Sequence, residues 1–170
     1  VFVYSNRHGD ERALVVYNNA YAPTRGRIHT SAAINFGSAE DRDLRRLTLS
    51  EALGLRDAPD VFYLFRDARD GLQYLRRGTS LAHEGMYFDL AGYQYHVFLD
   101  FEEIVDTDHV WSRVCDRLNG RGVPDIHRVF RETVLAPMLE TFRLVLNPRT
   151  LTEFTRSLHE PKRQAPVRKA

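Results

Sequence analysis

The sequence predicts a mainly β protein, an antiparallel β-sandwich of Greek-key type followed by a C-terminal α-helical appendage. Up to residue 105, β-branched and aromatic residues form short runs separated by Gly, Asn, Asp and Pro, which is typical of antiparallel sandwiches and barrels. From residue 106 onward apolar residues recur with the period of a helix. We therefore expect a sandwich over residues 1–105, amphipathic helices over 106–159 that pack on it or on a missing neighbour, and a basic flexible tail over 160–170.

The first two strands are expected at residues 1–4 and 13–18. Asn, Gly and Asp lie between them, and these residues tolerate the positive φ that a chain reversal often needs. The spacing therefore predicts a hairpin. Next the sequence predicts a weaker strand at residues 27–34 and a polar loop at residues 37–46. A short helical turn follows at residues 48–53, and Gly54 ends it.

The strongest β signal lies between residues 61 and 101. Asp70-Gly71 separates two apolar runs, and an Asp-Gly pair in this position is a strong hairpin signal. Apolar and polar residues then alternate over 86–90 and 92–101, so one face of each strand should line the core. No helix is expected between these strands, which favours an antiparallel sandwich over a βαβ sheet.

Three helices are expected in the second part of the chain. The first begins after residue 106 and ends near Gly120. The second begins near Pro124 and should bend at Pro137. The third covers residues 151–158.

Composition excludes several classes of function. The chain has 24 basic and 23 acidic side chains, so it has no general attraction to nucleic acid or anionic membrane. No apolar run is long enough to span a bilayer. We therefore expect neither nucleic acid nor a membrane to be a partner of this chain. The single cysteine, Cys115, excludes an internal disulfide and fits a reducing compartment. We expect a cytoplasmic location, because the start at Val1 lacks the regions of a signal peptide and suggests a piece of a longer polypeptide.

No motif predicts catalysis, a metal or a cofactor. Residues 102–109 contain four carboxylates, but their spacing does not fit an EF-hand. The better interpretation is that Asp106, Thr107 or Asp108 caps the helix that follows. Histidines lack the spacing of a zinc-binding helix, and no nucleophile elbow, Walker loop or dinucleotide fingerprint is present.

Tyrosines are frequent in the strand half, and two of them are candidate carbohydrate-binding residues. Sugar rings present apolar C–H faces, so an exposed tyrosine beside polar groups suits a glycan site. On this basis we single out Tyr74 and Tyr87. Ordinary cross-strand packing remains the commoner role for any one tyrosine.

Two further residues are expected to be structural. Trp111 shares an apolar helical stripe with Cys115, so its indole should turn inward. His96 lies on the face of its strand opposite Tyr95 and Val97, where we expect it to face solvent or to make a cross-strand hydrogen bond.

Three segments, at residues 13–19, 62–77 and 86–101, together resemble the C-terminal region of large bacterial α-amylase-like proteins of glycoside hydrolase family 13. In that family a strand of the type L-V-V-x-N opens the β-sandwich that follows the catalytic barrel, and a run like L-x-x-Y-x-Y-x-V-F closes it. The matching positions are residues 14–18 and 90–98, and the hairpin over 62–77 is also similar. The resemblance is good over about the first hundred residues and loose over the rest.

The resemblance implies a non-catalytic C-terminal accessory domain of an α-amylase-family glycosidase or transglycosidase that acts on α-glucans. Such a domain packs on and stabilises the catalytic (β/α)8 barrel of the same polypeptide, and it sometimes holds a glucan chain, which makes α-glucan a candidate partner. The two catalytic carboxylates of the family lie in the barrel, outside this chain. No catalytic residue, metal or cofactor is therefore assigned.

Two alternatives compete with this hypothesis. A stand-alone carbohydrate-binding module would expose a line of aromatic side chains on one sheet face. A protein-interaction domain that binds through its helices would present a large bare apolar helix face.

Overall fold

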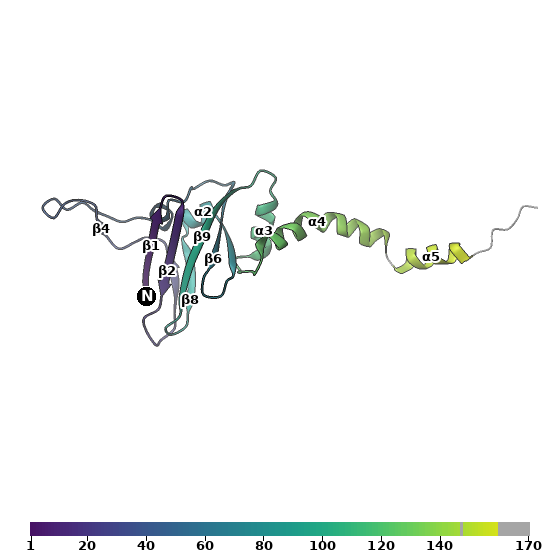
Figure 1. Ribbon diagram of the computed structural model, residues 1–170, viewed down its shortest axis with the longest axis horizontal. Coiled ribbons are helices and arrows are strands. Elements are labelled where there is room, and N and C mark those ends of the chain that lie inside the picture. Colours follow the sequence, from purple (N-terminus) through teal and green to yellow (C-terminus); the bar gives the residue numbers. More distant parts are fainter. Residues whose placement is uncertain (147, 160–170) are drawn as a thin grey trace, which may run out of the picture. The chain divides into compact units, whose positions relative to one another are not determined.

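The computed structural model describes residues 1–146 and 148–159, and it is mainly β with antiparallel sheets and several helices (Figure 1). The chain divides into two compact units, of which the first is Val1–Thr133. This unit contains both core clusters of the described chain. It extends well past residue 105, where the sequence changes from strands to helices.

The main element is a five-stranded antiparallel sheet with the strand order β1-β2-β9-β6-β7. In that order its strands are Phe2–His8, Glu11–Tyr17, Tyr95–Val105, Val61–Asp67 and Gln73–Arg77. Two smaller antiparallel sheets pair β3 with β8 and β4 with β5. Their strands are β3 (Thr24–Ile28), β8 (Met86–Leu90), β4 (Ile34–Asn35) and β5 (Leu44–Arg45).

Both predicted hairpins are confirmed. Strands β1 and β2 pair over their full length around Gly9, and β6 and β7 pair around Asp70-Gly71. Gly71 has a φ of +75°, which favours glycine. The Asp70 carboxylate accepts a hydrogen bond from the amide of Leu72 at 2.9 Å, so local side-chain chemistry fixes this turn.

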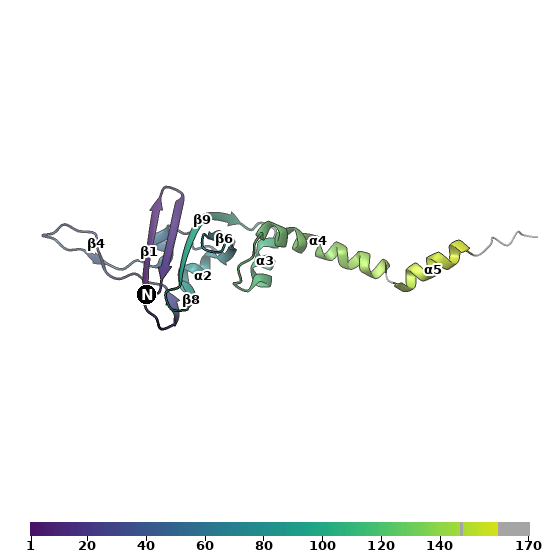
Figure 2. The same ribbon diagram turned by 60° about the horizontal axis from the view of Figure 1, so that its bottom comes forward.

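The larger core cluster lies on one face of the five-stranded sheet. Buried side chains from β2, β6 and β9 meet those of β8 there, and β8 lies beside β9 in both views (Figures 1 and 2). Phe65 is at the centre of the cluster, with ring centroids 4.8 Å from Phe101 and 5.4 Å from Phe98. The β3–β8 sheet therefore packs on this face.

A bulge in β9 determines which of its residues face this core. The register between β6 and β9 shifts between Leu64 and Arg66, and Asp100 in β9 has a φ of +58°. The extra residue allows Phe98 and Phe101, which are three positions apart, both to face inward. Tyr95, on the other face of the strand, is 47% exposed.

Helix α1 (Leu49–Leu53) confirms the predicted turn, with a capping box at Thr48 and a left-handed Gly54 after it. Helix α2 (Gly78–His83) was not predicted, and the expectation that no helix separates the strands between residues 61 and 101 is wrong here. Its first residue must be small, because a Cβ on Gly78 would lie 2.6 Å from the carbonyl oxygen of Arg56. Arg77 before the helix makes no side-chain capping bond, and Leu81 of α2 is buried in the larger core cluster, so packing holds this helix.

The remaining helices are α3 (Val110–Leu118), α4 (Ile126–Val145) and α5 (Pro148–His159). Helix α3 and the first turns of α4 pack on the β6–β7 part of the second face of the large sheet and form the smaller core cluster. Trp111 is half-buried there, and its ring centroid lies 4.4 Å from that of Phe130. Cys115 packs against the same cluster. Both residues are structural, as predicted.

The acidic segment before α3 acts as a helix cap, as predicted. Asp106 is 5% exposed, and its two carboxylate oxygens accept hydrogen bonds from the amides of Trp111 (3.1 Å) and Ser112 (2.8 Å). Asp108 accepts one further bond, from the amide of Val110. These bonds satisfy amides that the first turn of the helix leaves free.

We expect Asp106→Ala to lower the free energy of unfolding by about 1–2 kcal/mol, because two helix amides lose their acceptors. Asp108→Ala is the matched control, since Asp108 is exposed and accepts a single bond, and it should cost less than half as much. Urea denaturation followed by circular dichroism measures both. Equal losses in the two variants would show that Asp106 is not the main cap.

Among the described residues, no helix combines the length and apolar character that crossing a membrane requires. The basic tail predicted over residues 160–170 lies outside the described residues.

Candidate functional site

The second face of the five-stranded sheet is only partly covered. Its β6–β7 part, including Phe62 and Leu64, is buried under α3 and α4. On the same face, Arg66 of β6 pairs with Leu99 of β9, so Val97 and Tyr95, two and four residues before Leu99, also lie on this face. The face continues across β2 to β1, and there it carries exposed apolar side chains.

We call this uncovered part the open face, and its residues are Phe2, Tyr4, Val15, Tyr17, Tyr95 and Val97.

The strand register arranges the open face in two rows. Phe2, Tyr17 and Tyr95 are directly opposite one another on β1, β2 and β9, and Tyr4, Val15 and Val97 form the next row. Directly opposed residues of antiparallel strands point to the same side of a sheet. Phe2 (59%), Tyr4 (58%) and Tyr95 are exposed, whereas Val15, Tyr17 and Val97 between them are half-buried. The two rows together form an apolar surface that is most exposed along β1.

The local sequence explains why both faces of β2 are apolar. Leu14 and Val16 point into the larger core and are fully buried, whereas Val15 and Tyr17 point to the open face. A strand that reads as a nearly continuous apolar run is typical of a sheet covered on both sides. The apolar run at residues 13–17 is therefore the sequence signal of this surface, although the prediction drawn from it was only a strand of the first hairpin.

A buried polar pair lies on the core side of the same sheet. Asp67 is fully buried, and its Oδ2 lies 2.5 Å from His96 Nδ1. Its Oδ1 accepts hydrogen bonds from the amides of Arg69 (3.0 Å) and Val97 (3.2 Å). His96 Nε2 lies 3.3 Å from the side-chain amide of Gln94, so both ring nitrogens have partners. The pair links β6 to β9, which confirms the predicted cross-strand hydrogen bond of His96.

The structure does not bring the two candidate tyrosines together. Tyr74 on β7 stacks on Phe65 with ring centroids 5.9 Å apart, it packs against the larger core, and burial raises the pKa of its hydroxyl. Its ring is therefore engaged in packing. Tyr87 is 55% exposed on β8, opposite Arg27 in the register of the β3–β8 sheet.

A cleft of about 690 Å³ opens between the end of the β1–β2 hairpin and the β9 bulge. We call it the hairpin cleft, and its lining includes Asn6, Asp10, Glu11, Arg12, Leu99 and Asp100. No sequence pattern predicts this cleft, because it exists only where β2 and β9 stop pairing and nothing local to either segment signals that point.

Several charges at the hairpin cleft already have partners. Arg12 donates to the carbonyl oxygens of Asp10 at 2.8 Å and Leu53 at 2.9 Å. Arg66 donates to Asp100 Oδ2 through both Nε (2.9 Å) and Nη2 (2.7 Å). Both donors therefore share one carboxylate oxygen, and the contact is not the bidentate arginine–carboxylate pair in which each oxygen accepts one bond.

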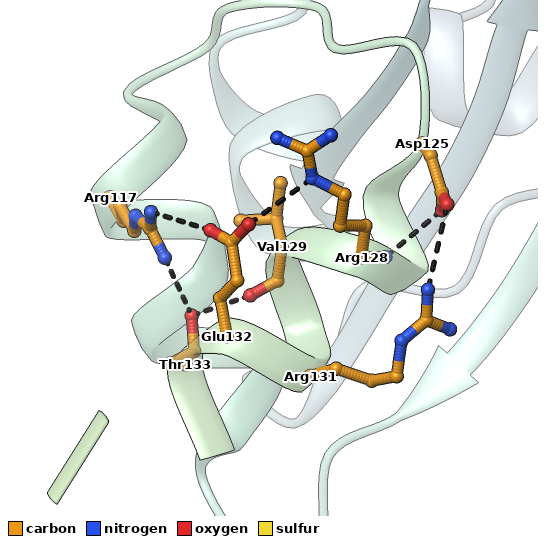
Figure 3. Close-up of polar contacts among 7 residues, drawn as sticks. All are labelled: Arg117, Asp125, Arg128, Val129, Arg131, Glu132 and Thr133. Carbon is orange, nitrogen blue, oxygen red and sulfur yellow. Dashed lines mark hydrogen bonds and ion pairs between the residues drawn. The ribbon is translucent and has the colours of Figure 1, made fainter. Parts of the chain in front are cut away.

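A second charged group lies on α3 and α4 (Figure 3). Glu132 accepts hydrogen bonds from Arg117 at 3.0 Å and from Arg128 at 3.2 Å, and these two guanidinium groups lower the pKa of its carboxyl. Asp125 accepts from the amide of Arg128 at 2.9 Å, and this bond lowers the pKa of Asp125. The group ties the start of α4 to α3, which is a structural role.

This group predicts an acid-dependent link between the helices. Because the pKa of Glu132 in the folded chain lies below its ordinary value of 4.5, its contribution to stability is complete above that value and is lost as pH falls through the lowered pKa. Glu132→Gln should flatten the pH dependence of stability in this acidic window, while Glu140→Gln serves as a control on the same helix. Thermal melts at neutral and acidic pH measure this pH dependence. The prediction is contradicted if the melting temperatures of both variants change with pH as that of the parent chain does.

In residues 1–146 and 148–159, no group of three or more His, Cys, Asp or Glu side chains is placed to hold a metal ion. Burial raises the pKa of the Cys115 thiol, which disfavours the nucleophilic thiolate.

The second unit begins at Val134. From that residue onward, α4 exposes a broad set of apolar side chains at helical spacing. They include Val134, Leu135, Met138, Leu139, Phe142 and Val145.

No protein-family model, curated protein or solved structure matches this chain.

Proposed function

We propose that this chain is the non-catalytic C-terminal accessory domain of an α-amylase-family glycosidase or transglycosidase that acts on α-glucans. In this role it packs on the catalytic (β/α)8 barrel of the same polypeptide through the open face and stabilises it. The observation that carries the proposal is the open face itself, a contiguous apolar surface on the large sheet.

A surface of this kind is costly in water. Contiguous apolar patches on soluble proteins commonly mark interaction sites, and β2 has the sequence of a strand covered on both sides. The resemblance to family 13 places a catalytic barrel before such a domain. The barrel is therefore the occupant that best fits the open face.

The rest of the fold supports the same assignment. The β3–β8 sheet packs on the five-stranded sheet through a common core, which suits the proposed Greek-key β-sandwich. The exposed apolar side of α4 suits a helical appendage with a further contact on a neighbouring domain. A single cysteine fits the proposed cytoplasmic location.

A stand-alone carbohydrate-binding module is the second candidate, and one observation favours it. Phe2, Tyr17 and Tyr95 form a line of aromatic side chains on one sheet face, of which Phe2 and Tyr95 are exposed and Tyr17 is half-buried. However, Val15 and Val97 occupy the adjacent row, and a mixed aliphatic and aromatic surface suits a protein partner better than a sugar.

The test compares open-face variants in two settings, the chain alone and the polypeptide that joins it to a preceding barrel. We expect Tyr4→Ser and Tyr95→Ser to destabilise the joined polypeptide by about 1.5–3 kcal/mol each, because each removes an aromatic ring from a buried interface. In the chain alone the same variants should change stability by less than about 0.5 kcal/mol.

Tyr87→Ser is the matched control, because Tyr87 is similarly exposed but lies on the other sheet. It should be neutral in both settings. Equal effects of the open-face variants with and without the barrel would refute the docking role. Loss of α-glucan binding by these variants in the chain alone would instead establish the module.

A further inference from the structure

We propose that two copies of this chain associate by exchanging arms, so that Phe36 of each copy fills a pocket of the other. The arm is the β4–β5 hairpin with its root, residues 30–48. The pocket lies between β1 and β3, and we call it the edge pocket. Its lining includes Val1, Gly26, Ile28, Phe88 and Leu90. This association is separate from the proposed docking on a barrel, because the edge pocket opens between the two sheets and not on the open face.

The arm is an ordered hairpin whose shape is fixed by its own residues. A β-bridge joins its two ends, β4 pairs with β5, and the amide of Phe36 donates to the carbonyl oxygen of Asp43 at 2.8 Å. The side-chain oxygen of Asn35 accepts hydrogen bonds from the amides of Gly37 at 3.1 Å and Asp43 at 3.0 Å. These bonds lie on both sides of Phe36 along the chain, so they hold this residue in a defined position.

The arm presents apolar side chains to solvent. Phe36 is 55% exposed and Ile34 is 43% exposed, and their spacing of two residues on one strand places them on the same face of the arm. Neither residue belongs to a core cluster. In both views the arm projects past β1, away from the rest of the five-stranded sheet (Figures 1 and 2). An ordered element that exposes apolar side chains in this way is typical of an interaction site.

The edge pocket exists because β3 lacks a side chain at a position that faces the core. Ile28 packs against the larger core cluster, and Gly26, two residues earlier, faces the same way. A Cβ on Gly26 would have no atom within 4 Å, and the pocket has a volume of about 160 Å³. An apolar cavity of about 150 Å³ holds a benzene ring. The edge pocket is therefore large enough for the ring of a phenylalanine.

The arm and the edge pocket lie at the same edge of the first unit. The pocket is beside Val1 at the start of β1, and the arm projects past β1 (Figure 1). Phe36 does not line the pocket of its own copy, because the arm runs away from it. A two-fold axis at this edge brings each arm to the pocket of the other copy, so the contact is reciprocal and the assembly closes as a dimer. Residues 1–6 of the edge strand β1 carry no charged side chain, so no like charges meet there.

The charges of the arm and of the edge pocket have opposite signs. The tip of the arm, residues 37–43, carries three acidic side chains and one basic one. The charged side chains of the pocket lining are Arg25 and Arg27. Arg27 is paired with Glu84 at 3.1 Å, whereas Arg25 forms no ion pair in the described part of the chain, although Asp89 lies opposite it in the register. An acidic tip beside Arg25 favours this pairing of surfaces over others.

The test is sedimentation equilibrium of the full chain over a wide range of concentrations. We expect a monomer–dimer equilibrium that is weak, because each arm buries one ring and its neighbour Ile34, and small interfaces are transient. Dilute chain is therefore monomeric, and Phe36→Ala acts on association while the folding of the monomer stays unchanged. Phe36→Ala and Gly26→Leu, which fills the pocket without a clash, should each weaken the dimer about a hundredfold, since both contacts are lost and each ring contributes about tenfold.

Mixing the two variants tests the exchange itself. The arm of the Gly26→Leu copy can enter the empty pocket of the Phe36→Ala copy, which restores one contact of the two. The mixed pair should therefore associate about tenfold more weakly than the parent dimer and about tenfold more strongly than either variant alone. Sedimentation of an equimolar mixture, with one variant carrying a fluorescent label, measures this recovery.

Leu44→Ala is the matched control, because Leu44 is 61% exposed on the same arm but pairs with Asn35 and so lies on the opposite face from Phe36. It should associate as the parent chain does, and Arg25→Glu should weaken association. The proposal is overturned if the chain stays monomeric at every concentration, if Leu44→Ala weakens the dimer as much as Phe36→Ala, or if the mixture shows no recovery. Loss of the dimer in Tyr4→Ser but not in Phe36→Ala would also overturn it, because the copies would then meet through the open face.

Discussion

Replacing Asp67 with alanine is expected to lower the free energy of unfolding by about 3–5 kcal/mol, the range for removing one partner of a buried pair. The carboxylate is fully buried and has partners at both oxygens. Its loss leaves the amides of Arg69 and Val97 and the ring of His96 without an acceptor inside the protein. Urea denaturation monitored by fluorescence and circular dichroism measures the change.

Asp67→Asn is the discriminating control. Asparagine keeps the volume and one carbonyl oxygen, which can still accept from the backbone amides, so the loss should be less than half of that in Asp67→Ala. Asp60→Ala, at an exposed aspartate before β6, should have little effect. If Asp67→Asn and Asp67→Ala were equally destabilising, the charge on Asp67 rather than its hydrogen bonds would dominate.

The parts of the fold that the sequence predicted are those determined by neighbouring residues. Thr48 caps α1 and Gly54 ends it, Asp106 caps α3, and Asp70-Gly71 turns the β6–β7 hairpin. In each case a side-chain oxygen or a glycine acts within a few residues of its own position. Such signals are readable without knowledge of the tertiary structure.

The parts that could not be predicted depend on contacts between distant segments. Helix α2 begins at Gly78, whose fit is set by the carbonyl oxygen of Arg56. In β9 both faces carry aromatic residues, so alternation alone did not show that His96 and Phe98 point to the core. The bulge at Asp100 determines which residues after Phe98 point to the core, and it appears only in the pairing of β9 with β6.

The candidate site follows the same division. Tyr87 was expected to be an exposed tyrosine and is one. Tyr74 instead packs against the larger core, where its ring stacks on Phe65. The apolar run of β2 indicates the open face, because apolar and polar residues would alternate in a strand with one side exposed to solvent. The hairpin cleft had no such signal, since its walls come from β1, β2 and β9 together.

Phe65→Ala is expected to cost about 3–5 kcal/mol, the range for removing a buried aromatic ring whose cavity does not collapse. Phe65 is fully buried and contacts Phe98, Phe101 and Tyr74, side chains on two other strands that cannot all move into the space. Phe36→Ala is the matched control, because Phe36 is 55% exposed and its loss should change stability by less than about 0.5 kcal/mol. Chemical denaturation of both variants decides the matter, since similar losses would mean that the ring of Phe65 is not the centre of the core.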